Sequence, residues 1–278
     1  MKQAKFILLL VFFACEEVVV VDLPDPQSLF VIEGVITDER KLQSVTISQT
    51  TGFSDPNPVI PIESAEVLVQ SRAGETFLFT HHENGTYRSN IEFAGMAMQE
   101  YRVRVLLENG DEIRSKWEQM PDMVEILNLS SDSFQENDPD NNNQQITVYF
   151  PKVSAIDPTD TKNYYRWIFY RDGERYVEPE SITIQDDRFF DGNFIPNNFQ
   201  DFGYDLNDQI IVQLLSISKE SFEYLSLLKS QITTLGTSSG TTPSVVNGNL
   251  EYISDEINEQ VLGFFSTVAI SADTTMAE

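Results

Sequence analysis

The stretch FLFTHHENGTYR at residues 77–88 places strand-forming residues on both sides of Asn84-Gly85. Asn-Gly supplies the positive φ angles that a two-residue hairpin turn requires, so this stretch predicts a β-hairpin. A second hairpin is predicted where residues 101–107 and 111–117 flank Asn109-Gly110. Together the two signals indicate antiparallel β structure.

Short runs rich in Val and Ile extend this pattern in both directions along the chain. Further strands are predicted at residues 29–37, 43–50 and 65–71. Strands at this spacing are typical of a small immunoglobulin-like β-sandwich, which we place at residues 27–120. Met120-Pro121 marks its end, because proline interrupts the hydrogen bonding of a sheet.

Residues 121–278 are predicted to form a second antiparallel β domain that carries one main α-helix. Its strands are expected at residues 124–129, 145–150, 164–170 and 209–217, with a polar break at residues 135–145. The helix is expected at residues 218–235, because Ser218 can cap its first turn and Gly236 can end it. The sequence therefore predicts a mainly β protein.

The composition limits the classes of partner. The chain has 278 residues, 44 acidic and 18 basic side chains, and a net charge of -26. Nucleic-acid binding depends on Lys and Arg neutralising phosphates, so we do not expect DNA or RNA as a partner. The single cysteine excludes an internal disulfide and a cysteine zinc cluster. We expect no catalytic cofactor.

The N-terminus predicts export and lipidation. A basic start is followed by the apolar run of residues 6–13, which is too short to span a bilayer, and then by Ala14 and Cys15. Residues 1–14 are predicted to be a signal peptide. The position of Cys15 resembles that in a bacterial lipoprotein signal, which implies that residues 15–26 are a tether acylated on Cys15; a free cysteine in the core is the alternative. Glu16 and Glu17 resemble the signal that exports bacterial lipoproteins to the cell surface; the alternative is that they belong to a solvated tether. Removing residues 1–14 leaves 44 acids against 16 bases, a net charge of -28.

Residues 186–204 form the most unusual stretch, with aromatic and acidic side chains but no regular period. One interpretation is a structural loop whose Phe residues fill the core while its acids face water. The other is contact with a ligand or partner through Asp186, Asp187, Asp191 and Phe194. Glycosidases also use two close carboxylates. Such catalysis needs one acid to be desolvated, and the polar composition of this stretch does not indicate that.

Two other motifs imitate known sites. The G-x-S-x-G pattern around Ser238 follows a predicted helix rather than a strand, and both histidines precede it, so it does not fit a hydrolase. Residues 138–142 resemble the start of a calcium loop but lack its glycine and its terminal Glu. A loosely bound calcium ion there stays an open alternative to a solvated loop.

Several motifs in order resemble a Bacteroidota lipoprotein family defined as a domain of unknown function. They are VIEG at residues 31–34, GTY at 85–87, YYRW at 164–167, DDRFFDG at 186–192, NGN at 247–249 and LGFF at 262–265, all downstream of the lipoprotein signal. The resemblance implies a neighbouring TonB-dependent outer-membrane receptor as partner, and no established enzymatic residues.

These observations lead to one functional expectation and two alternatives. The expectation is a non-enzymatic lipoprotein, anchored in the outer membrane and facing outward, that captures ligand for or docks on a TonB-dependent receptor in nutrient uptake. The first alternative is a structural or adhesive surface lipoprotein. The second is a hydrolase that uses Asp186, Asp187 and Asp191.

Overall fold

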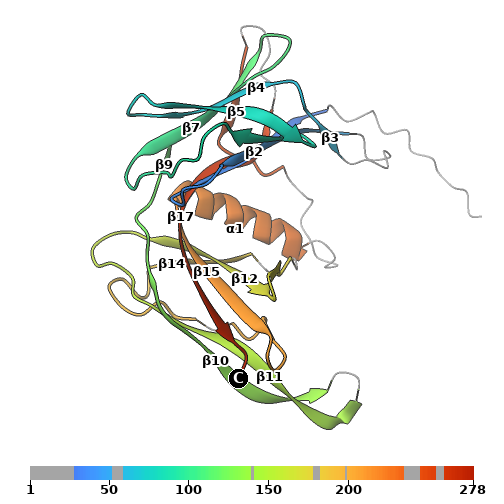
Figure 1. The fold of residues 1–278 in the computed structure, drawn as a ribbon, viewed down its shortest axis with the longest axis vertical. Helices are drawn as coiled ribbons and strands as arrows, with labels where there is room; N and C mark the ends of the chain where they lie inside the picture. The colour runs from blue at the N-terminus through green and yellow to red at the C-terminus, as the bar shows by residue number, and fades with distance from the viewer. Residues whose placement is uncertain are drawn as a thin grey trace, which may run out of the picture.

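The computed structural model describes residues 28–51, 59–138, 141–177, 182–197, 199–234, 245–254 and 260–278. The chain is mainly β, with one large sheet, a second two-stranded sheet and one helix in the described residues (Figure 1). This confirms the predicted fold class.

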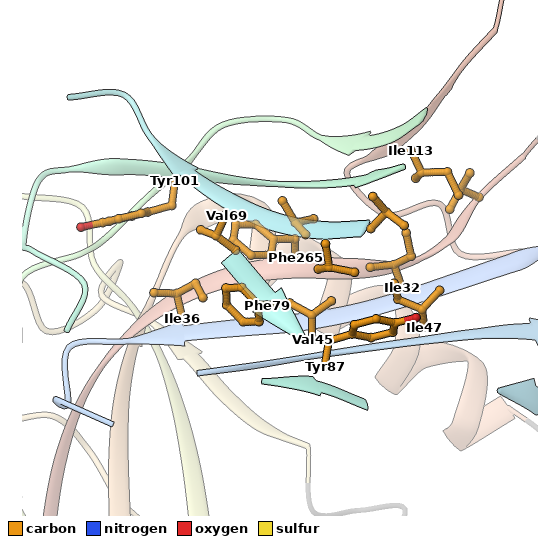
Figure 2. Close-up of a cluster of buried hydrophobic side chains, with 14 of the residues drawn as sticks. Ile32, Ile36, Val45, Ile47, Val69, Phe79, Tyr87, Tyr101, Ile113 and Phe265 are labelled. Atoms are coloured by element: carbon orange, nitrogen blue, oxygen red, sulfur yellow. The ribbon is translucent and has the colours of Figure 1, made fainter. Parts of the chain in front are cut away.

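The N-terminal half is a sandwich-like body built from short antiparallel strands. They are β1 (Phe30–Thr37), β2 (Ser44–Thr50), β3 (Val59–Pro61), β4 (Glu66–Ser71), β5 (Thr76–Glu83), β6 (Thr86–Ser89), β7 (Glu100–Leu106), β8 (Glu112–Ser115) and β9 (Glu118–Gln119). Alternate residues point into one core, where Ile32, Ile47, Val69 and Tyr87 are almost fully buried (Figure 2).

The predicted hairpin between β5 and β6 is confirmed. Asn84 and Gly85 have φ angles of 47° and 72°, as the turn requires. The β7–β8 connection differs, because only Gly110, and not Asn109, has a positive φ. The amide of Asp111 instead donates to Oδ1 of Asn109 at 3.0 Å, which makes a longer turn stabilised by that side chain.

The C-terminal half contains a sheet, a ribbon and the helix. Its elements are β10 (Ile126–Asp138), β11 (Asn141–Ala155), β12 (Tyr164–Arg171), β13 (Glu174–Arg175), β14 (Thr183–Asp186), β15 (Gln209–Ile217), α1 (Lys219–Thr234), β16 (Leu250–Ile253) and β17 (Leu262–Met276). One face of β12 buries Tyr165, Trp167 and Phe169 in a second core. The predicted helix is confirmed, and Oγ of Ser218 accepts a hydrogen bond from the amide of Ser221 at 3.0 Å.

The expected polar break at residues 135–145 is wrong. Strands β10 and β11 continue through most of it as a long two-stranded ribbon that projects from the C-terminal half (Figure 1). The polar residues that indicated a break are the exposed side chains of the outer part of this ribbon, where Gln135 pairs with Thr147. A ribbon with solvent on both faces does not show the apolar alternation by which strands are predicted.

The last strand, β17, belongs to both halves. Its residues 262–268 pair in parallel with β1, and its residues 268–276 pair antiparallel with β15. Phe265 reaches the N-terminal core (Figure 2), whereas Ala277, directly after the strand, lies in the C-terminal core. β16 also pairs with β8 of the N-terminal half. The C-terminal segment thus holds the two halves in one continuous sheet.

Gly263 enables β17 to approach β1, and its replacement by Ala is expected to destabilise the protein by about 2–5 kcal/mol. Its φ is +90°, and a Cβ there would lie 2.1 Å from the carbonyl oxygen of Ile32. Gly74→Ala is the matched control, because Gly74 has a φ of +101° but no atom within 4 Å of its Cβ position. Urea unfolding should show a clearly larger loss for Gly263→Ala; equal losses would contradict the role of the close approach.

Candidate functional site

A cleft lies between α1 and the face of the sheet that is turned away from the two main cores. The helix rests on this face through two ring contacts, Phe222 against Tyr164 of β12 and Tyr224 against Phe264 of β17, with centroids 5.2 and 4.8 Å apart. Beside these contacts the helix leaves a hollow of about 540 Å³. Cavities of this size hold small organic ligands.

Strands of both halves line the cleft. The sheet floor comes from β1, β2, β12, β15 and β17, and the helix forms one wall. The apolar part of the lining comprises Val35, Leu42, Ile168, Ile182, Leu215, Ile217, Leu225, Leu228, Phe264, Val268 and Ile270. Because β17 joins the halves beneath it, the cleft lies on the part of the sheet that both halves share.

The charged side chains of the lining are mostly basic, in contrast to the chain as a whole. They are Arg166, Arg175, Lys41 and Glu33. Lys41 is paired with Glu39 at 2.6 Å. Burial, with a smaller effect of the neighbouring Arg175, lowers the pKa of Arg166 to about 10, so its guanidinium stays charged at neutral pH.

Sequence reasoning missed this cleft. It interpreted the aromatic run of β12 as core on one face and exposed on the other, and gave no role to Arg166. The available signal was the arginine itself, which stands between Tyr165 and Trp167 in a strand where alternate residues are buried. The contribution of β1 and β17 to the floor depends on pairing between distant segments, which no local pattern indicates.

The carboxylates that lie together at the predicted acidic stretch are not the predicted set. Asp187 and Asp191 meet Asp157, and one oxygen of each lies within 4.8 Å of the others. Asp157, which sequence reasoning missed, is 1% exposed, and Asp187 is 7% exposed. The expectation that the acids of this stretch all face water is therefore wrong for Asp187.

The three carboxylates hold loops in place. Asp157 accepts hydrogen bonds from the hydroxyl of Tyr165 and, at 3.1 Å, from the amide of Gly192. Asp187 accepts from the amide of Asn163 at 2.6 Å, and Asp191 from the amide of Asp160 at 3.0 Å. Three carboxylates at this spacing are also of the type that binds a hard cation such as Ca²⁺, but these hydrogen bonds account for their positions without one.

The other predicted contact residues lie apart from this cluster. Asp186 forms an ion pair with Arg188 at 2.8 Å. Phe194 is 64% exposed and pairs with Ile156, which is 45% exposed, through an isolated β-bridge. Phe189, which was not predicted as a contact, is 90% exposed. Phe190, Phe199 and Phe202 fill the core as expected, so the aromatic residues of this stretch divide between core and surface.

A buried carboxyl, Glu118, joins the two halves near the start of α1. It is 2% exposed and accepts hydrogen bonds from Oγ of Ser218 at 2.7 Å and from Nδ2 of Asn249 at 2.9 Å. Asn249 in turn bonds both backbone groups of Phe265. Burial raises the pKa of Glu118 to about 7. Its hydrogen-bond partners come from the N-cap of α1 and the segment before β16, and Asn249 connects it to β17, so its protonation is linked to the junction of the halves.

The other predicted sites fall outside the described residues. These are Cys15, Glu16 and Glu17, together with Ser238 and most of the calcium-like loop, of which only Asp138 has a described side chain. The one helix among the described residues is not long and apolar enough to cross a membrane.

A known family matches most of this chain. The model of a family described as "Domain of unknown function (DUF4249)" matches residues 16–274. The match begins directly after Cys15 and ends within β17, so it covers both halves and every residue of the cleft lining. The sequence matches none of the curated proteins with which it was compared.

Proposed function

We propose that this chain, which belongs to the DUF4249 family, is a cell-surface lipoprotein that captures a small ligand for a TonB-dependent outer-membrane receptor. The observation that carries ligand capture is the cleft of about 540 Å³ between α1 and the shared sheet. Its lining is apolar with a few polar groups, which is typical of a site for a small molecule.

The proposed location rests on the N-terminal sequence. Cys15 follows a short apolar run and precedes Glu16 and Glu17, as in the exported lipoproteins of Bacteroidota that the chain resembles. Acyl chains on Cys15 would anchor the protein through buried methylenes, each worth about 0.8 kcal/mol. The proposed role is binding, and no reaction is assigned to the protein.

Copurification tests the receptor part of the proposal. A tag is placed after Glu278, which is exposed, and the protein is purified from detergent-solubilised outer membranes. We expect a β-barrel receptor in near-stoichiometric amount. Purification without such a receptor, from cells grown on several nutrients, would contradict the partnership and would favour the adhesive alternative.

Cys15→Ser is expected to abolish anchoring, because it removes the only thiol of the chain and with it the acylation site. Fractionation should move most of the protein, more than tenfold over wild type, from the membrane to the soluble fraction, and labelling with radioactive palmitate should be lost. Ser28→Ala, a substitution of another small polar residue on the N-terminal side of β1, serves as control. Unchanged anchoring of Cys15→Ser would refute lipidation at this residue.

A further inference from the structure

The side chain of Arg166 lies on the cleft face of β12. Its neighbours in sequence, Tyr165 and Trp167, are fully buried on the opposite face. Across the sheet Arg166 pairs in register with Leu215, and Leu215 pairs with Ile270 of β17. On its other side Arg166 pairs with Ile184 of β14, so the arginine lies within a cross-strand row whose other members are apolar.

This guanidinium lacks a partner among the described residues. Nε of Arg166 is buried and makes no hydrogen bond there. The charged group that acts on it most strongly is Arg175, which carries the same sign. Burial of an unpaired charge is costly, and buried arginines are normally matched by acceptors. Although the chain has 44 acidic residues, none of the carboxylates among the described residues pairs with this arginine.

The lining adds a second basic group and an apolar surface. Arg175 of β13 is exposed at the cleft and forms no ion pair with a described residue. Leu225 and Leu228 of α1 face the floor across the hollow. The charges of the lining are thus two guanidinium groups that have no partner among the described residues, the paired Lys41, and Glu33 on β1.

We propose that the cleft binds a small organic anion, whose carboxylate is held by Arg166 and Arg175 and whose apolar body lies between the floor and α1. A guanidinium offers two parallel N–H donors that match a planar carboxylate. This inference rests on the proposed capture function and names the chemical class of the ligand.

Fluorine NMR with matched probes tests this class. The mature chain from residue 16 onward, without lipid, is titrated in 0.15 M salt with 4-(trifluoromethyl)phenylacetate and with 4-(trifluoromethyl)benzylamine, which share an apolar ring but differ in charge. We expect the carboxylate to bind at least tenfold more tightly than the amine. Equal affinity, or tighter binding of the amine, would overturn the anion class while leaving capture in the cleft supported. Binding of neither probe at millimolar concentration would overturn the proposed site.

Substitutions at the arginine separate binding from packing. Arg166→Met keeps an apolar stem and should lower carboxylate affinity at least tenfold, while Arg166→Lys should lose less because it keeps the charge. Arg88→Met, at an exposed position of β6 outside the cleft, should leave the affinity unchanged. Unchanged affinity of Arg166→Met would overturn the proposal. The proposal would also be overturned if Arg166→Met lowered the melting temperature of the ligand-free protein as much as a core substitution does, because the arginine would then have a structural partner.

The two proposals fail in distinguishable ways. Loss of receptor copurification concerns the partner and is measured in membranes. Loss of charge preference concerns the ligand and is measured on the isolated chain. Either result can occur without the other.

Discussion

A chain that ends at Val261 is expected to lose the cooperative unfolding transition of both halves. Without β17, strands β1 and β15 lose their shared neighbour, and the edges of the two half-sheets are left unpaired. The N-terminal core loses Phe265 and Ala269, and the C-terminal core loses Ala277. A domain is stable by only about 5–15 kcal/mol, and the loss of a central strand exceeds that margin.

The two tryptophans make this result measurable in each half separately. Trp117 lies in the N-terminal half with the guanidinium of Arg102 4.4 Å from its ring, and Trp167 is fully buried in the C-terminal core. Chains with a single tryptophan, Trp117→Phe or Trp167→Phe, should report one common urea midpoint in the full-length protein and no cooperative transition after truncation.

A shorter truncation is the matched control. A chain that ends at Ser271 keeps all pairs with β1 but loses the pairs of residues 272–276 with β15. The fluorescence of Trp117 should still show a cooperative transition, whereas that of Trp167 should unfold at lower urea. A wild-type midpoint for Trp117 in the chain that ends at Val261 would show that the N-terminal half folds without its last strand.

Glu118→Gln is expected to make the protein more stable than wild type at pH 8, by about 2–3 kcal/mol, and equally stable at about pH 4.5. Burial raises the pKa of Glu118 from 4.5 to about 7 in the folded protein. The folded state therefore binds the proton more tightly than the unfolded state does. The stability linked to this proton is fully present below about pH 4.5 and is lost as the pH rises through 7.

The substitution keeps the hydrogen bonds at the junction. Oε1 of the new glutamine can accept from Nδ2 of Asn249, and its amide can donate to Oγ of Ser218, in place of the bonds that Glu118 accepts now. Glu118→Ala should instead be less stable than wild type at both pH values, because both donors lose their acceptor.

Urea midpoints of wild type and Glu118→Gln, compared at each pH, check the prediction because the other acids contribute equally to both. Glu220→Gln removes a nearby exposed acid that adds to the raised pKa of Glu118 and should change the pH dependence only slightly. If the stabilities of wild type and Glu118→Gln changed with pH in the same way, ionisation of Glu118 would not destabilise the folded protein, and the prediction would be wrong.

Most local elements could be predicted from the sequence. Strands with one buried face, such as β1, β4 and β15, show the alternation that the pattern requires, and α1 begins at a good N-cap, Ser218. β10 and β11 were only partly predicted because their outer parts face solvent on both sides. The 15-residue β17 was not predicted as a strand at all. Its two ends pair with different partners, so its importance appears only in the sheet.

The candidate site was predictable only in part. Asp187 and Asp191 were predicted as site residues, together with Asp186 and Phe194, because they belong to one unusual stretch of the sequence. Asp157 could not be added because it lies far from that stretch, in the loop before β12. Arg166 was visible as a charged residue in an aromatic strand. Its place beneath α1 follows from the order of strands β12, β15, β17 and β1 across the sheet, which depends on contacts between the two ends of the chain.

The shared strand β17 also determines when the protein can fold. The amide of Ile270 donates to Oδ1 of Asp38 across a separation of 232 residues, and the parallel pairs of β1 span a similar distance. The entropy cost of closing so long a loop must be met before the contact between the two strands stabilises the fold, and this slows folding. During synthesis, β1 stays without its β17 partner until residues 262–268 have been added. The floor of the cleft is therefore completed only after β17 has been made, so binding competence arises late in synthesis.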